Sequence, residues 1–597
     1  MANIKITPLN IELTASVDSN LMEFLTLNGI NLKNNCGFRG SCKKCTVKLL
    51  SGNLNNDAHY IDNIYLACQS KISEDIEIEL IEYSLDKAFK INKKFDFHSS
   101  LTCLQMEKIN INVLPPSKED KTADFERVMA LFPDYSIAGV EVLKKLPFAL
   151  RENNWNISVI KDNFKKLIVD IDKPSDKQIL GLAVDIGTTT VNIIITDLTN
   201  GKIIDSASSY NEQISFGTDV ISRIIYSQRE KGIETLKAAV VSTINKLIDD
   251  ICQNNNLIPS NIYQAVFAGN TTMMHILLGI VPNFLRIEPY VPAFFNYSPV
   301  ANEIGININK YASIYCYESF GSYVGGDISA GILASRMYKN DEISLLIDIG
   351  TNGEIVLGNA DWLISCACSA GPAFEGAGVK NGSRAINGAI DSVKINNKSL
   401  EPEITVINKQ KPIGICGSGM IDAIAELFKA GIIDRQGKFI KNSERIKDKS
   451  YILVNIGEID SDKEIVISES DIQNIVRTKG AIFAGIYSLL EYAGITLDEI
   501  SKIYVAGGLG ESIDFKNAVA IGLFPDIDRN KYEYLGNTSL KGCYLRLINY
   551  KEEQDIKKIS EIMNYFDISE DEEYMNRFIS SLFIPHTDLS LFPNIFK

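Results

Sequence analysis

The stretch GLAVDIGTTTVNIIITD, residues 181–197, decides the fold of the larger part of this chain of 597 residues. It reads as a buried strand, a Gly/Thr turn and a second buried strand, because two apolar runs flank a short polar segment. A near copy, LLIDIGTNGEIVLG, returns at residues 345–358 and shares the string Asp-Ile-Gly-Thr. Such self-similarity indicates a duplicated fold. We therefore predict two related halves, about 178–340 and 341–597, each a mixed sheet covered by helices.

Both turns carry residues suited to phosphate binding. Asp185 and Asp348 each open the shared string, and glycines with hydroxyl or amide side chains follow. Glycine permits a tight turn, and backbone N–H and hydroxyl groups can hold phosphate oxygens. We predict that the two aspartates are catalytic and organise Mg²⁺ or a water near the γ-phosphate of ATP. The residues predicted to bind the phosphates are Gly187, Thr188, Thr189, Thr190, Gly350, Thr351, Asn352 and Gly353.

A third Gly-rich turn follows the apolar strand IYVAGG and contains Gly507, Gly508 and Gly510. A backbone without side chains can lie flat against adenosine. Taken singly, each loop is as typical of an ordinary hairpin turn. Two phosphate loops and an adenosine loop in this order resemble the superfamily of acetate and sugar kinases, Hsp70 and actin (ASKHA). This resemblance implies an ATPase domain over 178–597, in which two RNase-H-like halves close on ATP.

Four of the eleven cysteines cluster near the N-terminus, with the spacing C-x5-C-x2-C-x22-C. They are Cys36, Cys42, Cys45 and Cys68. Four thiolates can fill the protein-ligand positions of an iron–sulfur cluster. The spacing and the preceding strand–strand–helix order resemble the [2Fe–2S] ferredoxins, which implies a β-grasp domain over 1–85. A structural zinc site is the alternative, but zinc ribbons usually have two CxxC knuckles, and only one is present here.

The remaining segments suggest how these parts are joined. Residues 86–116 are rich in Lys and Asn and end in a Pro-Pro pair, which predicts a linker. A small mixed α/β domain is predicted over 117–177. Residues 221–251 have the helical periodicity suited to packing on the sheet of the first half. The predicted fold class is thus multidomain, combining α+β and α/β parts.

Composition narrows the functional classes. A net charge of −15 disfavours a nucleic-acid partner, because phosphate binding requires a basic surface. No apolar stretch reaches 18 residues, so the sequence predicts neither a membrane span nor export. The odd number of cysteines is typical of reduced thiols plus one metal site. These features favour a cytoplasmic location.

The pairing of a ferredoxin domain with this ATPase resembles one family, the reductive activators of corrinoid proteins. Several local strings also look like that family: FGTDVISRI (216–224), AGNTTMMHILLG (268–279), SYVGGDISAG (322–331), SAGPAFEGAG (369–378) and GICGSGMID (414–422). The likeness covers the cluster domain and residues from about 181 onward, whereas 86–176 match only loosely.

The resemblance implies an ATP-hydrolysing activase with a [2Fe–2S] cluster, ATP and Mg²⁺. Such a protein passes an electron through its cluster to return an inactive Co(II) corrinoid protein of a methyltransferase system to Co(I). It further implies an upstream low-potential electron donor and, by analogy, a homodimer.

Three other functions stay open at this point. A small-molecule kinase would leave the ferredoxin domain unexplained. An electron donor to another low-potential enzyme would carry its cluster cysteines within the ATPase fold. A binding module would use ATP only as a structural ligand. A redox role for Cys366, Cys368 or Cys416 also stays open beside their interpretation as buried thiols, and His275 is expected to pack on a helix.

Overall fold

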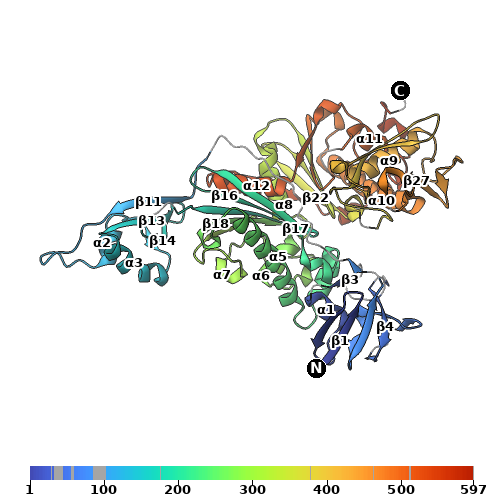
Figure 1. Ribbon diagram of the computed structural model, residues 1–597. Helices are drawn as coiled ribbons and strands as arrows, with labels where there is room; N and C mark the ends of the chain where they lie inside the picture. Colours follow the sequence, from blue (N-terminus) through green and yellow to red (C-terminus); the bar gives the residue numbers. More distant parts are fainter. Residues whose placement is uncertain are drawn as a thin grey trace. The chain divides into compact units, whose positions relative to one another are not determined.

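The computed structural model describes most of the chain (Figure 1). The described residues are 1–28, 30–32, 40, 43, 45–55, 59–81, 83–84, 102–174, 177–376, 378–461, 463–509 and 513–595. They divide into two compact units. The first comprises Met1–Cys316 with Leu547–Tyr550, and the second comprises Tyr317–Arg546 with Lys551–Lys597.

The N-terminal part of the first unit is a β-grasp domain. Its sheet has the order β2-β1-β9-β4-β7-β6, in which β1 pairs parallel with β9 and antiparallel with β2. Alternate residues of β1 are buried, as expected of a strand with one face on a core. The strands are β1 (Ala2–Thr7), β2 (Ile11–Ala15), β4 (Thr46–Ser51), β6 (His59–Ile61), β7 (Ile64–Leu66) and β9 (Ile76–Leu80). Short pairs join β3 (Asn31–Leu32) to β10 (Tyr83–Ser84) and β5 (Leu54–Asn55) to β8 (Lys71–Ile72).

Helix α1 (Leu21–Leu27) packs on this domain, and Asn20 caps its start. The Asn20 side chain accepts a hydrogen bond from the Glu23 backbone N–H at 3.1 Å. This satisfies one of the amide groups that a helix start leaves without an intrahelical partner.

A small four-stranded sheet follows in the order β11-β13-β14-β12. Strand β11 (Met106–Asn112) lies in the segment predicted as a linker, yet it pairs along its whole length with β13 (Asn156–Asp162). The second half of the sequence MEKININ explains this, because Ile109 and Ile111 alternate with the polar residues Lys108, Asn110 and Asn112. The other elements are β12 (Ser136–Ile137), β14 (Leu167–Asp172), α2 (Asp124–Met129) and α3 (Val140–Glu152).

The larger sheet of the first unit contains the first quoted stretch. Its order is β17-β16-β15-β18-β19, with antiparallel pairs β15–β16–β17 and parallel pairs β15–β18–β19. The strands are β15 (Leu180–Ile186), β16 (Thr190–Asp197), β17 (Lys202–Tyr210), β18 (Ile262–Gly269) and β19 (Ser313–Cys316). The helices of this part are α4 (Val220–Ser227), α5 (Gly232–Asn254), α6 (Thr271–Leu278) and α7 (Ala301–Ile304).

The second unit repeats this topology. Its sheet has the order β30-β29-β20-β21-β22-β31, with antiparallel pairs β20–β21–β22 and parallel pairs β20–β29–β30. The strands are β20 (Ser344–Ile349), β21 (Gly353–Gly358), β22 (Leu363–Cys368), β29 (Lys502–Gly507), β30 (Tyr532–Gly536) and β31 (Met563–Tyr565). The shared strand order confirms the predicted duplication.

Further elements complete the second unit. Its other strands are β23 (Ala389–Ile395), β24 (Pro402–Val406), β25 (Gly414–Ile415), β26 (Ile446–Lys447), β27 (Ser450–Val454) and β28 (Ile465–Ser468). Its helices are α8 (Gly326–Ser335), α9 (Gly417–Lys429), α10 (Glu469–Ala493), α11 (Phe515–Ala520), α13 (Glu552–Ile562) and α14 (Tyr574–Ser580). Helix α12 (Thr538–Ile548) begins in the second unit and ends in the first.

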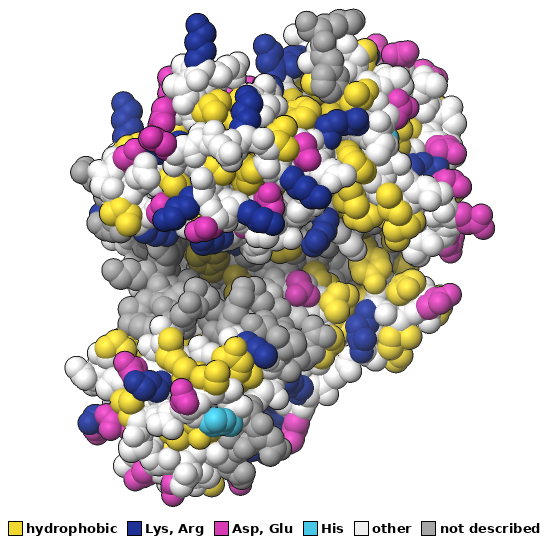
Figure 2. Space-filling model, turned by 90° about the vertical axis from the view of Figure 1, so that its right-hand side faces the viewer, with side chains coloured by type: hydrophobic (Ala, Val, Ile, Leu, Met, Phe, Trp, Pro, Cys, Tyr) yellow, Lys and Arg dark blue, Asp and Glu magenta, His cyan; other side chains and the backbone are white. Residues whose placement is uncertain are grey.

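Two surface properties bear on function. Within the described ranges, no helix is both long and apolar enough to span a bilayer. Figure 2 shows one face, on which basic and acidic side chains are intermingled with apolar ones.

The fully buried Lys479 side chain joins α10 to the C-terminal segment. Its Nζ donates to the backbone oxygens of Phe583 and Pro585, each at 2.6 Å. We predict that Lys479→Ala lowers the free energy of unfolding of the second unit by about 3 kcal/mol, because two buried carbonyls lose their donor. Urea denaturation followed by circular dichroism measures this. Lys398→Ala, at an exposed position, is the control and should change little; equal loss in both variants would contradict the prediction.

Candidate functional site

The first phosphate loop is a tight turn between β15 and β16. The Gly187 N–H donates to the Thr190 backbone oxygen at 2.8 Å and closes the turn. A Cβ atom on Gly187 would lie 2.7 Å from that same oxygen, so only glycine fits without a shift. Asp185 is buried near the end of β15, where its Oδ2 accepts from the Asn192 side chain at 3.0 Å. The loop therefore holds an oriented carboxylate beside a glycine turn.

Polar side chains clamp this loop from neighbouring elements. Asn211 donates to the Gly187 oxygen at 3.0 Å, and the fully buried Arg223 donates to the Thr188 oxygen. The Asn270 side chain donates to the Thr188 hydroxyl at 3.0 Å. Arg223 and Asn270 come from two of the quoted family-like strings. These strings thus hold the backbone of Gly187–Thr190 in one conformation.

The second phosphate loop has the same position between β20 and β21. The Gly350 N–H donates to the Asn352 oxygen at 3.0 Å. The Thr351 hydroxyl donates to Glu375 Oε1 at 3.0 Å, and the other oxygen of Glu375 pairs with Arg384 at 3.1 Å. The string SAGPAFEGAG therefore supports the loop through its glutamate.

The Gly507–Gly508 turn lies against this second loop. Because β20 and β29 pair in parallel, Ile349 is opposite Gly507. The Gly508 N–H donates to the Ile349 oxygen at 3.0 Å. Around Gly508, no atom of the described residues lies within 4 Å of an added Cβ, which leaves the open surface that a flat adenosine requires. Gly510 lies outside the described residues.

Two further carboxylates accompany Asp348, and the sequence prediction missed both. Glu354 lies on β21 and Asp327 in the first turn of α8. Burial raises the pKa of the Glu354 carboxyl well above its usual value, and the charges of Asp327 and Asp348 raise it further. A divalent cation here would remove this repulsion. The signal was available, because Glu354 belongs to the quoted repeat and Asp327 to SYVGGDISAG.

The arrangement suits magnesium better than a metal held by protein alone. Across the described ranges, no three His, Cys, Asp or Glu side chains converge closely enough to hold an ion together. Mg²⁺ usually keeps several waters and takes one or two carboxylates plus substrate phosphates. The predicted Mg²⁺ ligation by Asp185 and Asp348 stays a prediction.

The described part of the cysteine cluster fits an iron–sulfur site. Cys45 and Cys68 are buried neighbours, whereas Cys36 and Cys42 lie outside the described residues. The hydrogen bond with Cys45 lowers the pKa of the Cys68 thiol to about 6, although burial opposes the shift; the Gln69 side chain and Gly40 backbone N–H lower it further. Thiolates with N–H donors around them are what cluster ligation requires.

The other candidate thiols are buried in the second unit. Cys366 and Cys368 lie on β22, and Cys416 precedes α9. Burial raises the pKa of Cys366 well above its usual value and also raises that of Cys416. Their predicted burial is confirmed. His275 is likewise buried on α6, where its Nε2 accepts from the Ala293 N–H at 3.0 Å.

The fold and these sites define a protein with a [2Fe–2S] ferredoxin-like domain and an ASKHA domain of two RNase-H-like halves. Sequence models of four families match the chain in order. They are the 2Fe-2S iron-sulfur cluster binding domain (residues 4–73), the RACo linker region (104–178), the RACo middle region (180–340) and the C-terminal domain of RACo, the ASKHA domain (342–596).

Individual proteins similar to this chain support the same family as the sequence models. A solved structure described as a reductive activator for corrinoid, iron-sulfur protein is 39% identical, with a TM-score of 0.78, 99% coverage of this chain and 100% of that chain. The corrinoid activation enzyme RamQ of Eubacterium limosum is 29% identical over 595 residues, covering 96% of this chain and 97% of that protein. The [Co(II) methylated amine-specific corrinoid protein] reductase of Methanosarcina barkeri is 28% identical over 237 residues, covering 36% and 41%. The chain therefore belongs to the family of reductive activators of corrinoid proteins.

Neighbouring glycines test the adenosine loop. A Cβ on Gly507 would lie 2.3 Å from the Ile349 oxygen and 2.7 Å from Asp348 Oδ1, and its φ is +98°. We predict that Gly507→Ala disturbs the loop, lowering both the melting temperature and ATP affinity. The added methyl group of Gly508→Ala meets no atom in the described part of the chain, so this variant should keep the melting temperature and weaken only ATP binding. Calorimetry measures both quantities; a Gly507→Ala variant as stable as the wild type would contradict the prediction.

Proposed function

We propose that this chain is an ATP-dependent reductive activator that returns an inactive Co(II) corrinoid protein of a methyltransferase system to Co(I). The observation that carries the proposal is that one chain joins a cluster-binding domain to a nucleotide-loop domain. The similarity to the corrinoid activation enzyme RamQ covers 97% of that protein and so includes both domains. A small-molecule kinase would need the nucleotide-loop domain but not the cluster-binding domain.

The chemistry explains why both features belong in one chain. When bound by Cys36, Cys42, Cys45 and Cys68, a [2Fe–2S] cluster supplies a one-electron carrier. The reduction potential of such clusters is about −400 mV in plant-type ferredoxins. Each shortfall of about 59 mV costs tenfold in a one-electron equilibrium. Co(II) in a corrinoid is harder to reduce than this, so direct transfer is unfavourable. ATP can assist only if the protein states it stabilises differ in affinity for the corrinoid partner.

The two phosphate loops and the glycine turn have separate roles in this proposal. Gly187–Thr190 and Gly350–Gly353 bind the phosphates of ATP, and Gly507, Gly508 and Gly510 form the adenosine surface. Asp185 and Asp348 position Mg²⁺ or the attacking water. Glu354 and Asp327 add negative charge that favours a cation beside Asp348.

We further propose the remaining partners and boundaries. An upstream low-potential protein reduces the cluster, the chain forms a homodimer, and it works in the cytoplasm, where its thiols stay reduced. The domains are 1–85, 117–177 and 178–597, and residues 86–116 connect the first two. The β11 strand extends the middle domain into that connection.

Loss of the Asp348 carboxylate should strongly slow ATP-dependent cobalt reduction. We predict that Asp348→Asn lowers ATP-dependent Co(I) formation by at least about tenfold, as expected for loss of a group that positions a metal ion. The assay mixes reduced protein anaerobically with Co(II) corrinoid protein and follows Co(I) absorption with and without MgATP. Asp361→Asn, an exposed aspartate, is the control. Cobalt reduction that is independent of ATP in the wild type would overturn the proposed function.

The cluster should be separable from nucleotide binding. We predict that Cys68→Ser abolishes the visible iron–sulfur absorption while ATP affinity stays within about twofold, because the ligand and the nucleotide loops belong to different domains. Cys103→Ser is the control and should retain the absorption. Zinc in place of iron and sulfide in the wild type would contradict the proposal.

A further inference from the structure

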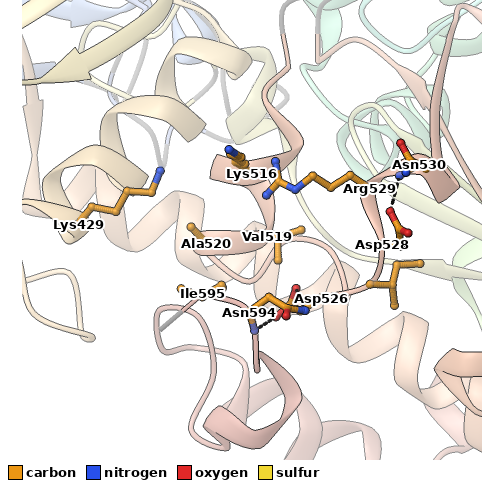
Figure 3. A pocket seen from close by; sticks show the side chains of 11 residues that line it. Lys429, Lys516, Val519, Ala520, Asp526, Asp528, Arg529, Asn530, Asn594 and Ile595 are labelled. Carbon is orange, nitrogen blue, oxygen red and sulfur yellow. Dashed lines mark hydrogen bonds between the residues drawn. The ribbon is translucent and has the colours of Figure 1, made fainter. Parts of the chain in front are cut away.

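The second unit contains a polar pocket of about 720 Å³ that the proposed function does not use (Figure 3). It lies among the end of α9, helix α11, the segment before β30 and the C-terminal segment. The lining residues are Lys429, Lys516, Val519, Ala520, Asp526, Ile527, Asp528, Arg529, Asn530, Asn594 and Ile595.

This pocket is separate from the nucleotide loops. Those loops follow the carboxyl ends of β20 and β29, whereas Arg529 and Asn530 precede β30, which is parallel to β29. The length of helix α9 indicates the distance between the nucleotide loops and the pocket. An added Cβ on Gly417, its first residue, would meet Phe374 and Leu509, close to the loops. Lys429, its last residue, lies 12 residues later, about 18 Å along a helix.

Three cationic side chains gather at the pocket. Lys429 Nζ donates to Asn517 at 2.5 Å and to Glu426 at 3.1 Å. Among the described residues, no carboxylate forms an ion pair with Lys516 or Arg529. In Figure 3 the Arg529 guanidinium extends toward Lys516. Like charges that face each other repel, and an anion bound between them would reduce this repulsion.

The two carboxylates of the lining are already engaged with amides. Asp526 accepts from the Asn594 backbone N–H at 2.7 Å and from its side chain at 3.2 Å. Asp528 accepts from the Asn530 backbone N–H at 3.0 Å. These contacts shape the pocket but leave both negative charges in place, so the three cations of the lining exceed its two carboxylates by one.

Arg529 belongs to the minority of arginines in the second unit that form no ion pair with a carboxylate among the described residues; the others are Arg435 and Arg477. Five arginines of this unit each pair with a carboxylate at 3.1 Å or less: Arg336, Arg384, Arg445, Arg546 and Arg577. The chain carries a net charge of −15, so carboxylates are abundant. A concave group of cations in an acidic protein therefore favours an anionic ligand over a structural role.

We propose that this pocket binds a small organic phosphate. The guanidinium of Arg529 presents the planar fork that matches phosphate oxygens, and the two lysines add point charges. Val519, Ala520, Ile527 and Ile595 offer apolar surface for the organic part of the ligand. The volume is in the range of small-molecule sites, about 300–1,000 Å³. This is an assignment beyond the proposed ATP and corrinoid chemistry.

Titration calorimetry with inorganic pyrophosphate tests the phosphate subsite. The full chain is first saturated with Mg²⁺ and a non-hydrolysable ATP analogue, so that the probe cannot occupy the nucleotide loops. We expect saturable binding that Lys516→Gln/Arg529→Gln weakens by at least about tenfold, because charge-assisted hydrogen bonds to phosphate are lost. Lys398→Gln/Lys447→Gln removes the same charge at exposed positions outside the pocket and should bind like the wild type.

Two outcomes would overturn the site, and one would overturn its ligand class. Absence of saturable binding to the wild type, or equal binding by the two double variants, would remove the site. Tighter binding of citrate than of pyrophosphate would replace phosphate by carboxylate. Lys516 and Arg529 are exposed, so their variants should fold; the single variants Lys516→Gln and Arg529→Gln provide the same comparison if the double variant is unstable.

Discussion

The backbone contact between Gly507 and the Asp348 loop is the constraint on which the nucleotide site of the second unit depends. Parallel pairing of β20 with β29 brings two segments about 160 residues apart in the chain to one edge of the sheet. A hydrogen bond from the Tyr534 hydroxyl to the Gly507 oxygen, at 3.0 Å, fixes the turn from its other side. A side chain at Gly507 would occupy the space that the carboxylate of Asp348 needs.

Different side chains hold the phosphate loops of the two units. In the first, Asn211, Arg223 and Asn270 hold the phosphate loop through its carbonyl and hydroxyl oxygens. In the second, the Glu375–Arg384 pair holds the Thr351 hydroxyl. The strand order is conserved between the halves, while the side chains around each loop have diverged. That divergence gives each loop its own electrostatic surroundings, and in the second unit Glu354 and Asp327 add negative charge near Asp348.

Much of the fold followed from local patterns. The paired strands around each glycine turn were predictable, because apolar runs and turn residues act over a few positions, whereas the β-grasp domain followed from the resemblance to the [2Fe–2S] ferredoxins. The long helical pattern at 221–251 was predicted as one stretch, but the structure divides it into α4 and α5. Lys231, with a φ of +56°, separates them, and Gly232 starts α5 so close to the Tyr226 oxygen that a Cβ would lie 2.2 Å away.

The sequence by itself determined the cysteine spacing, the two phosphate loops and the duplication. Each of these is visible in the order of residues along the chain, without knowledge of which segments pack together. Only the tertiary structure decided that Asp327 and Glu354 lie near Asp348 and that Lys429, Lys516 and Arg529 share one pocket. These groupings depend on which strands pair and on how helices pack. Burial then sets the strength of the interactions, because charges removed from water act on one another through a lower effective dielectric constant.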